Sequence, residues 1–418
     1  MEYELKKERL YYRSPMPHLM LAAELSVSPS SATLTDAVTR ACARHETLCS
    51  RLDYDRKSGS VRFVPRDTPC KPSVFFTDAP FSWEAALSDL SDKPFDFTNG
   101  EFVRFGAYPS DGGITLVCAA AQVVCDNAAL SVLFSDILTA LSDPSATFAP
   151  IPAEFCDMKS LSASVKLPFT MRFMLKSINR TWRKGGVVFS DADYATLCSR
   201  YRDRHSLRVS SAIIDDDTLD ALDKFCESRD LPLCDVITAA VLLGTGESGI
   251  GTAVNIRAES NRSFTNHSAG FSANYFPSAE SSFPTRAEEL HSLLASRRRD
   301  PSKLFFVPRF LSLIDGDLID AAWFAAFAGC NDPIAVRAAS LTGFTSSSTQ
   351  LHVGELDVSE SPILNSVSFL PPLSPGVGYL FGFADSGNLA TITVAATDAA
   401  GKSPEEVIAA ALRLLKQC

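Results

Sequence analysis

Apolar and polar positions in the first 150 residues follow periods that predict strands interleaved with helices. Strands are expected at 18–25, 49–54, 61–64, 102–108 and 114–120, and helices at 34–43, after Ser82 and at 130–141. The strand 114–120 is apolar on both faces, which is typical of the centre of a sheet. Thr33 and Asp36 have the spacing of an N-cap pair for the first of these helices.

The second half of the chain shows the same mixture of elements. Strands are expected at 207–214 and 250–256, and helices over 219–225 and 236–243. Thr285 with Glu288, and Ser403 with Glu406, predict capping boxes for two further helices. The Pro-, Ser- and Ala-rich segment 144–152 is expected to be a linker. We expect an N-terminal lobe at 1–165 and a C-terminal lobe at 166–418.

Composition narrows the classes of function. The 418-residue chain has a formal charge of −10, which argues against a nucleic-acid partner because such proteins usually present basic faces. No apolar run approaches the roughly 18 residues of a membrane-spanning helix, and the charged start differs from a signal peptide. We therefore expect a cytoplasmic protein without a membrane span. The eleven cysteines show neither a C-x-x-C pair nor metal-ligand spacing, so buried reduced thiols and no metal are expected.

Three local patterns have a structural explanation beside a functional one. The basic segment 176–184 is typical of a solvated helix face, and the alternative is a docking patch for an anionic partner such as an acidic carrier protein or a CoA phosphate. Residues 244–249 match G-x-G-x-x-G, but a helix precedes them and a strand follows, so we expect a helix stop and turn instead of a nucleotide site. Cys125 has apolar neighbours and is expected to be a packed thiol.

Four motifs occur in order along the chain. Their sequences are Ala121-Gln122-Val-Val-Cys-Asp126-Asn127, Val254-Asn-Ile-Arg257, Gly270-Phe-Ser-Ala-Asn274-Tyr275-Phe276 and Leu351-His352-Val-Gly354. Together they resemble the condensation-domain and acyltransferase superfamily, which carries H-H-x-x-x-D-G, V-D-L-R, G-N-Y-F and S-N-L-G elements at these places. The resemblance covers nearly the whole chain.

This resemblance implies an α/β fold of two chloramphenicol-acetyltransferase-like lobes in a V, with a substrate tunnel between them. It implies no permanently bound cofactor. The acyl donor would be an acyl-CoA or a phosphopantetheine-linked acyl group, and the acceptor a small amine or alcohol. An acyl or peptidyl carrier protein is the implied macromolecular partner, and we expect a monomer.

The same resemblance assigns roles to individual residues. Asp126 and Arg257 are expected to form a buried structural ion pair. Asn127 replaces the motif glycine, and Asn tolerates the left-handed backbone that such a turn can require. Substrate-tunnel positions are implied for Asn274, Tyr275 and Ser347.

The motif histidines are absent from this chain. Their two positions hold Ala121 and Gln122. An amide cannot take up a proton near pH 7, and loss of a positioned base typically costs about 10²- to 10⁴-fold in rate. Of the six histidines, His352 is the candidate for a relocated base, because the S-N-L-G element of relatives lies near their reaction centre. The alternative is a hydrogen-bonded or solvent-facing side chain.

Two hypotheses follow. In the first, the protein is an acyltransferase that holds donor and acceptor together through Gln122, Asn274 and His352, with an amine as the favoured acceptor. In the second, it is a catalytically inactive protein of the same fold that binds a carrier protein, an acyl ligand or a biosynthetic partner. The retained tunnel motifs favour the first hypothesis. A Gln122-lined tunnel within reach of His352 would support it, and a tunnel filled by side chains would support the second.

Overall fold

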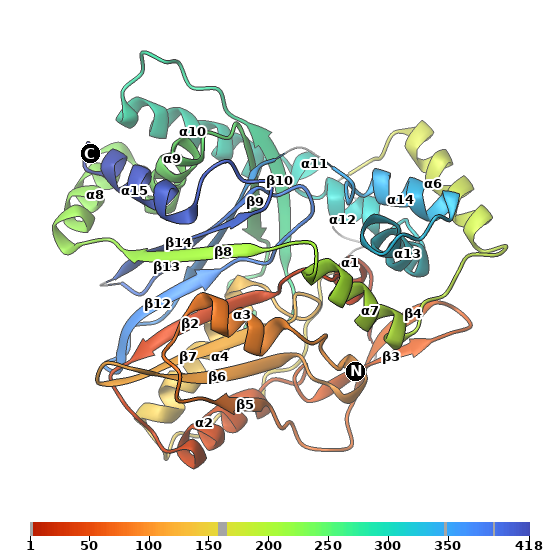
Figure 1. Cartoon of the computed structure of the whole chain (residues 1–418), viewed down its shortest axis with the longest axis horizontal. Helices are drawn as coiled ribbons and strands as arrows, with labels where there is room; N and C mark the ends of the chain where they lie inside the picture. Colours follow the sequence, from red (N-terminus) through yellow and green to blue (C-terminus); the bar gives the residue numbers. More distant parts are fainter. Residues whose placement is uncertain (1–2, 158–164, 347–348, 388) are drawn as a thin grey trace.

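The computed structural model describes residues 3–157, 165–346, 349–387 and 389–418. Two α/β lobes lie one above the other in Figure 1, each built on a sheet, and a mainly helical region covers one end of both. The mixed α/β architecture expected from the sequence is therefore confirmed.

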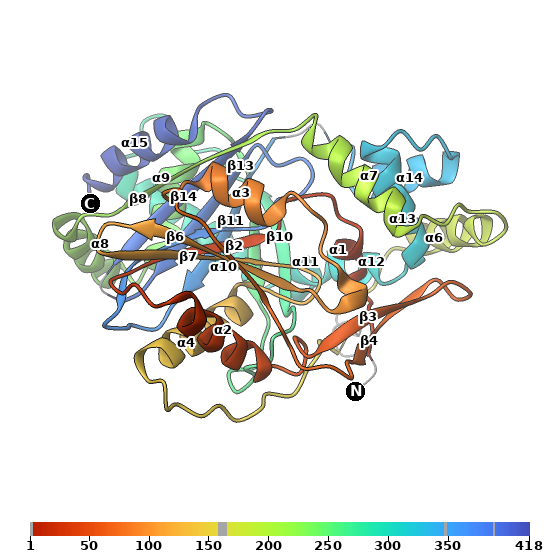
Figure 2. The same cartoon turned by 60° about the horizontal axis from the view of Figure 1, so that its bottom comes forward.

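The lower lobe in Figure 1 contains a five-stranded sheet. Its strands, in spatial order, are β12 (Leu364–Leu370), β2 (Leu19–Leu25), β7 (Gly113–Ala120), β6 (Val103–Ser110) and β5 (Ser73–Phe76). Figure 2 shows the helices α2 (Ser31–Ala43) and α4 (Asn127–Ser142) together on one side of this sheet, and α3 (Trp83–Ser91) on the other. The central strand β7 is almost completely buried, as its two apolar faces predict.

The upper lobe contains a six-stranded sheet. Its spatial order is β10 (Ser268–Asn274), β9 (Gly249–Asn255), β11 (Leu351–Asp357), β13 (Tyr379–Asp385), β14 (Ala390–Thr397) and β8 (Leu207–Ile213). β11 is parallel to both of its neighbours, and the other pairings are antiparallel. One face packs in an apolar core with the helices α8 (Asp216–Arg229), α9 (Leu233–Thr245), α10 (Phe283–Arg298) and α15 (Pro404–Leu415).

The remaining elements gather at the right-hand end of Figure 1. They comprise a three-stranded sheet of β1 (Tyr3–Glu4), β4 (Ser60–Pro65) and β3 (Ser50–Asp55), and a 3₁₀ turn at Phe97–Asn99. The helices here are α1 (Arg9–Tyr12), α6 (Phe169–Trp182), α7 (Asp191–Arg202), α11 (Pro301–Leu304), α12 (Phe306–Leu311), α13 (Gly316–Phe327) and α14 (Pro333–Leu341). Apart from Leu304 of α11, which belongs to the core of the upper lobe, their buried apolar side chains join the core of the lower lobe, so this packing unit draws on residues from both sides of position 165.

Helix boundaries confirm some sequence predictions and correct others. Ser403 and Glu406 form the predicted capping box, and Gly246, with φ +81°, ends α9 as expected from the glycine-rich segment. The N-caps predicted at Thr33 and Thr285 are wrong. Ser30 caps α2 and Ser282 caps α10, because in each case the serine hydroxyl accepts the N–H of the threonine three residues later. Each helix therefore begins one turn earlier than predicted.

Strand β12 crosses from the C-terminal part of the chain into the lower sheet, where it pairs antiparallel with β2. To reach that position it passes over the upper sheet at two glycines in register, Gly354 and Gly382. A Cβ built on Gly382 would lie 1.7 Å from the carbonyl oxygen of Phe369, and one on Gly354 would lie 2.8 Å from Cγ of Pro371. The crossover therefore requires residues without a Cβ at both of these positions.

We predict that Gly382→Ala lowers the free energy of unfolding by about 3 kcal/mol or more, because the added methyl overlaps backbone that cannot move aside. Gly251→Ala is the matched control. It lies in the same sheet, and its Cβ would meet no atom closer than 3.7 Å. A change of about 1 kcal/mol or less is expected there. Urea unfolding of both variants measures the difference, and equal midpoints would contradict the close approach.

Candidate functional site

The motif loop between β7 and α4 is anchored by Asp126, which is buried. Its Oδ1 accepts the backbone N–H of Ala129 at 2.8 Å and so caps α4. The same oxygen lies 2.9 Å from Nη2 of Arg257, and Oδ2 accepts the backbone N–H of His267 at 2.6 Å. The ion pair predicted from the sequence is therefore present, and it joins the two lobes.

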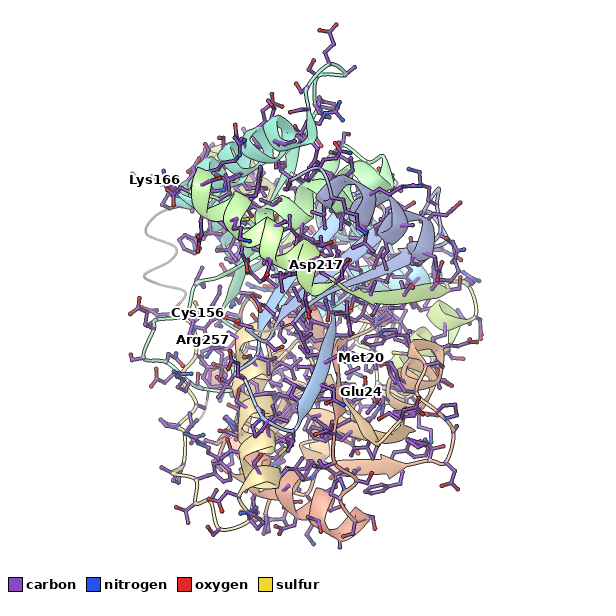
Figure 3. All side chains as sticks on the ribbon, turned by 90° about the vertical axis from the view of Figure 1, so that its left-hand side faces the viewer. Met20, Glu24, Cys156, Lys166, Asp217 and Arg257 are labelled. Atoms are coloured by element: carbon purple, nitrogen blue, oxygen red, sulfur yellow. The ribbon has the colours of Figure 1, made fainter. Side chains whose placement is uncertain are left out.

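Arg257 organises the segment that follows β9. Its Nη1 donates to Oδ1 of Asn261 at 3.2 Å and to the carbonyl of Ser263 at 2.7 Å, and its Nη2 donates to the carbonyl of Thr265 at 2.7 Å. Figure 3 shows Arg257 at the level where the two lobes meet. One guanidinium group thus holds the following loop against the motif carboxylate.

Asn127 differs from the prediction. It is the first residue of α4 and has no positive φ, so the expected left-handed turn is wrong. The asparagine instead makes a contact that glycine could not make. Its Nδ2 donates to the backbone carbonyl of Glu355 on β11 at 2.9 Å. Asn127 therefore adds a second link between the lobes beside the Asp126 ion pair.

Gln122 and His352 line one small cavity between the lobes, which we call the central cavity. It has a volume of about 30 Å³, which is enough for about two water molecules. Neither the Gln122 amide nor the His352 ring has a hydrogen-bond partner among the described residues. Burial lowers the pKa of His352 to about 4, so its ring is neutral at pH 7. The remaining wall is formed by Leu19, Cys125, Asp126, Asn127, Ala253, Ser268, Val353, Gly354, Pro371 and Pro372.

A larger cavity opens on one side of the central cavity. This Arg257 cavity has about 500 Å³ and shares four wall residues with the central one: Asp126, Asn127, Ala253 and Ser268. Its outer wall is mainly polar and includes Glu259, Arg262 and Glu355. It approaches the motif loop from the side of β9 and the N-terminus of α4.

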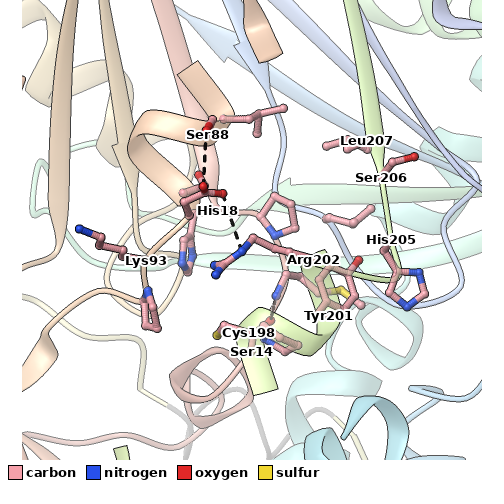
Figure 4. Close-up of a pocket in the computed structure, with 18 of the residues that line it drawn as sticks. Ser14, His18, Ser88, Lys93, Cys198, Tyr201, Arg202, His205, Ser206 and Leu207 are labelled. Atoms are coloured by element: carbon pink, nitrogen blue, oxygen red, sulfur yellow. Dashed lines mark hydrogen bonds and ion pairs between the residues drawn. The ribbon is translucent and has the colours of Figure 1, made fainter. Parts of the chain in front are cut away.

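A second cavity, of about 250 Å³, is shown in Figure 4. In two places, residues that are adjacent in the sequence line this His18 cavity and the central cavity respectively. His18 lines it while Leu19 lines the centre, and Leu373 lines it while Pro372 lines the centre. The central cavity therefore shares wall residues with the Arg257 cavity, and its wall continues along the chain into that of the His18 cavity.

The His18 cavity combines apolar side chains with polar ones. Tyr194, Cys198 and Tyr201 of α7 form one wall, and Asp92 at the end of α3 contacts Arg202 at 3.7 Å across it. Burial, together with the nearby Arg104 charge, lowers the pKa of His18 to about 3, so this imidazole is neutral at pH 7.

Two predicted tunnel residues lie away from this centre. Asn274 ends β10, whereas Ser268 at the start of that strand lines the central cavity, and six residues of strand span roughly 20 Å. The hydroxyl of Tyr275 instead lies 2.9 Å from Glu289 on α10. The structure therefore does not bring Asn274 and Tyr275 to Gln122, because the opposite end of β10 approaches the motif. Ser347 lies outside the described residues.

Two features of the site were missed from the sequence. Asn266 supports the motif loop, since its Nδ2 donates to the carbonyl of Gln122 at 2.7 Å and its Oδ1 accepts from Nζ of Lys7 at 3.1 Å. The pair Pro371–Pro372 fills the wall of the central cavity. The diproline after an apolar strand was a visible signal for a segment leaving its sheet, but no local pattern indicated Asn266.

Within the described residues, no group of three His, Cys, Asp or Glu side chains is placed to hold a metal ion. Among the helices of those residues, none has the length and apolar character needed to cross a bilayer.

Comparison with solved structures gives consistent matches over the whole chain. The condensation domain of the Monacolin K polyketide synthase MokA superposes with a TM-score of 0.64 at 12% identity, covering 100% of this chain and 97% of that one. The chain has the condensation-domain fold. The cyclization-docking bidomain of EpoB from Sorangium cellulosum gives 0.62 at 14% identity, covering 100% and 85% of the two chains. Polyketide synthase associated protein 5 from Mycobacterium tuberculosis gives 0.60 at 15% identity, covering 99% and 96%.

These matches confirm the fold that the four sequence motifs implied. No protein-family model matches the chain, and no curated protein matches it. At sequence identities of 12–15%, these matches show the fold alone. The chemistry of this chain depends on the residues of its own site.

We predict that Asp126→Ala lowers the free energy of unfolding by about 3 to 5 kcal/mol, because it leaves the buried Arg257 charge without its carboxylate. Asp36→Ala is the control, since it removes an exposed partner of Arg40 in an i,i+4 pair and should cost less than about 1 kcal/mol. Urea unfolding measures both changes. Similar small losses in the two variants would show that the interlobe ion pair is not structural.

A second prediction concerns acid stability. His352 has a folded pKa of about 4, against roughly 6.5 when unfolded. Between these values the unfolded chain binds a proton that the folded chain does not, so His352 makes acidification through this window destabilising. His352→Gln should therefore lose less stability than wild type between pH 6.5 and 4, by up to about 1.4 kcal/mol per unit of pKa difference.

Thermal or urea unfolding at several pH values measures this difference. Comparing each variant with wild type cancels groups such as Asp320, whose pKa burial raises to about 6 and which acts in the opposite direction. The exposed His205→Gln serves as the control. Parallel pH profiles for wild type and His352→Gln would contradict burial of a neutral ring.

Proposed function

We propose that this chain is a non-catalytic condensation-type protein that binds an acyl thioester between its lobes. The acyl group would be carried on the pantetheine arm of coenzyme A or of a carrier protein. The observation that carries the proposal is the central cavity, where about 30 Å³ adjoins Gln122 at the motif position. A thioester and an acceptor together need many times that volume.

The side chains at the central cavity are poor proton acceptors near pH 7. Acyl transfer to an alcohol needs a group that accepts the hydroxyl proton near neutral pH. The Gln122 amide cannot do so, and a histidine whose pKa is lowered to about 4 is a poor base at pH 7. Gln122 and His352 can orient a bound group in the central cavity by hydrogen bonding, but neither accepts a proton readily at pH 7.

Binding is supported by what surrounds the centre. The His18 and Arg257 cavities have about 250 and 500 Å³, and each is large enough for part of a thioester arm. The His18 cavity offers apolar contact at Leu87, Leu207 and Leu373 for methylene groups. Hydroxyls of Ser88 and Ser91 in the same wall suit the amide groups of a pantetheine arm. We therefore assign the thioester arm to the His18 cavity.

The second candidate function is acyl transfer to a free amine. It is favoured by one observation, that Gln122 and His352 line the same cavity without other partners among the described residues. In such a reaction the amine nitrogen forms a bond to the thioester carbonyl carbon, the C–S bond breaks, and the amine proton ends on the released thiol. The Pro371–Pro372 segment would have to move to admit both reactants.

Binding is tested by calorimetry with acetyl- and octanoyl-thioesters presented in three forms: on pantetheine, on coenzyme A and on an acyl carrier protein. We expect binding to wild type, weakened at least about 10-fold (1.4 kcal/mol) in Leu207→Trp, whose indole fills the His18 cavity. Val336→Trp places the same group on the exposed surface of α14 and should bind normally. Absence of heat with every ligand, or equal binding by both variants, would contradict the proposal.

Catalysis is tested separately by following free thiol from the same thioesters in the presence of a panel of amines and alcohols. We expect release no faster than without protein, and no change in His352→Gln or Gln122→Ala. Turnover with amines that disappears in His352→Gln would overturn the non-catalytic proposal and establish the second candidate.

A further inference from the structure

Helix α6 presents two large aromatic side chains to solvent. Phe169 is 79% exposed and Phe173 is 66% exposed, and their ring centroids lie 6.5 Å apart. The opposite side of the helix is buried in the core through Leu175, Ile178 and Trp182. Because phenylalanines at i and i+4 lie on the same side of a helix, the two exposed rings form one apolar patch.

Cationic side chains share the exposed face of α6. At about 100° per residue, Arg172, Lys176 and Arg180 fall with both phenylalanines within a sector of roughly 100°. All three are exposed, and none forms an ion pair with a described residue. Residues 169–184 contain five Lys or Arg and no Asp or Glu, in a chain whose net charge is −10. This segment is therefore locally positive, although the chain as a whole is negatively charged.

The basic surface continues beyond the helix. Arg56 and Lys57, in the turn between β3 and β4, line a hollow of about 890 Å³ together with Lys184 just after α6. Arg183 takes no part, because it is paired with Asp315 at 2.6 Å. Figures 1 and 2 both place α6 and the β3–β4 turn at the same extremity of the molecule, away from the helices of the upper lobe.

We propose that this extremity docks on an anionic lipid bilayer. Phe169 and Phe173 would enter the boundary between headgroups and acyl chains, while Arg172, Lys176 and Arg180 contact lipid phosphates. A helix with aromatic and cationic residues on one face has the character of an interfacial helix, and each cation near an anionic surface contributes about 1 kcal/mol. The inference is independent of acyl binding between the lobes.

The shape of the region favours lipid over an acidic protein. The helix α6 projects from the body as a ridge at the edge of the molecule (Figures 1 and 2), and its Phe169 and Phe173 are largely exposed. A protein partner would need a groove matched to this ridge, whereas a fluid bilayer adapts to it. Because the chain as a whole is acidic, nonspecific attraction to anionic vesicles is opposed by its net charge, so binding would report the local surface.

Vesicle sedimentation with the full chain tests the proposal. We expect the protein to pellet with phosphatidylcholine vesicles that contain phosphatidylglycerol, to remain in solution with phosphatidylcholine alone, and to be released by high salt. The double variant Phe169→Ala/Phe173→Ala and the triple variant Arg172→Gln/Lys176→Gln/Arg180→Gln should each weaken binding at least 10-fold. Circular dichroism melts check that both variants stay folded, since all five side chains are exposed.

The matched control is Lys224→Gln/Arg413→Gln/Lys416→Gln, which removes the same charge from exposed positions of α8 and the end of α15. It should bind as wild type does. Failure to pellet with anionic vesicles, equal pelleting with neutral ones, or equal losses in the control and the α6 variants would overturn the proposal. Retention of an acidic protein by α6 in the absence of vesicle binding would assign the surface to a protein partner instead.

Discussion

One buried carboxylate connects the main parts of this molecule. Asp126 caps α4 in one lobe, pairs with Arg257 from the other, and accepts the backbone N–H of His267. Removing one partner of a buried pair costs far more than replacing both, so the two residues hold each other in place. These contacts hold the motif loop through Asp126 and do not involve the side chain of Gln122.

Gln122, at the position where the resemblance led us to expect a histidine, lines the small central cavity. Strand β12 completes the lower sheet, and its continuation, Pro371–Pro372, then passes along the wall of the central cavity. Its path depends on close approach to Gly354 and Gly382. The element that joins the lobes is therefore also the element that restricts the space between them.

Sequence reasoning succeeded where the signal was local or carried by the motif resemblance. The strand at 114–120 was predictable because an apolar run of that length leaves few alternatives, and the Asp126–Arg257 pair was predictable because the resemblance assigned both residues to it. The positions of Asn274 and Tyr275 were not, because they depend on which end of β10 approaches the motif. The volume of the central cavity depends on side chains that reach it from several distant parts of the chain. Periodicity contains no information on such packing.

The fold itself does not require the exposed aromatic and cationic face of α6. Leu175, Ile178 and Trp182 already anchor the helix to the core, and Pro168 precedes its first turn. Phe169 and Phe173 therefore stabilise little by remaining in water, where their apolar surface is unfavourable at about 25 cal/mol per Å². The cations beside them are likewise left without carboxylate partners in the described part of an acidic chain. The fold does not need this surface, and water disfavours its apolar part. An anionic bilayer, as proposed above, would accept both the aromatic rings and the charges.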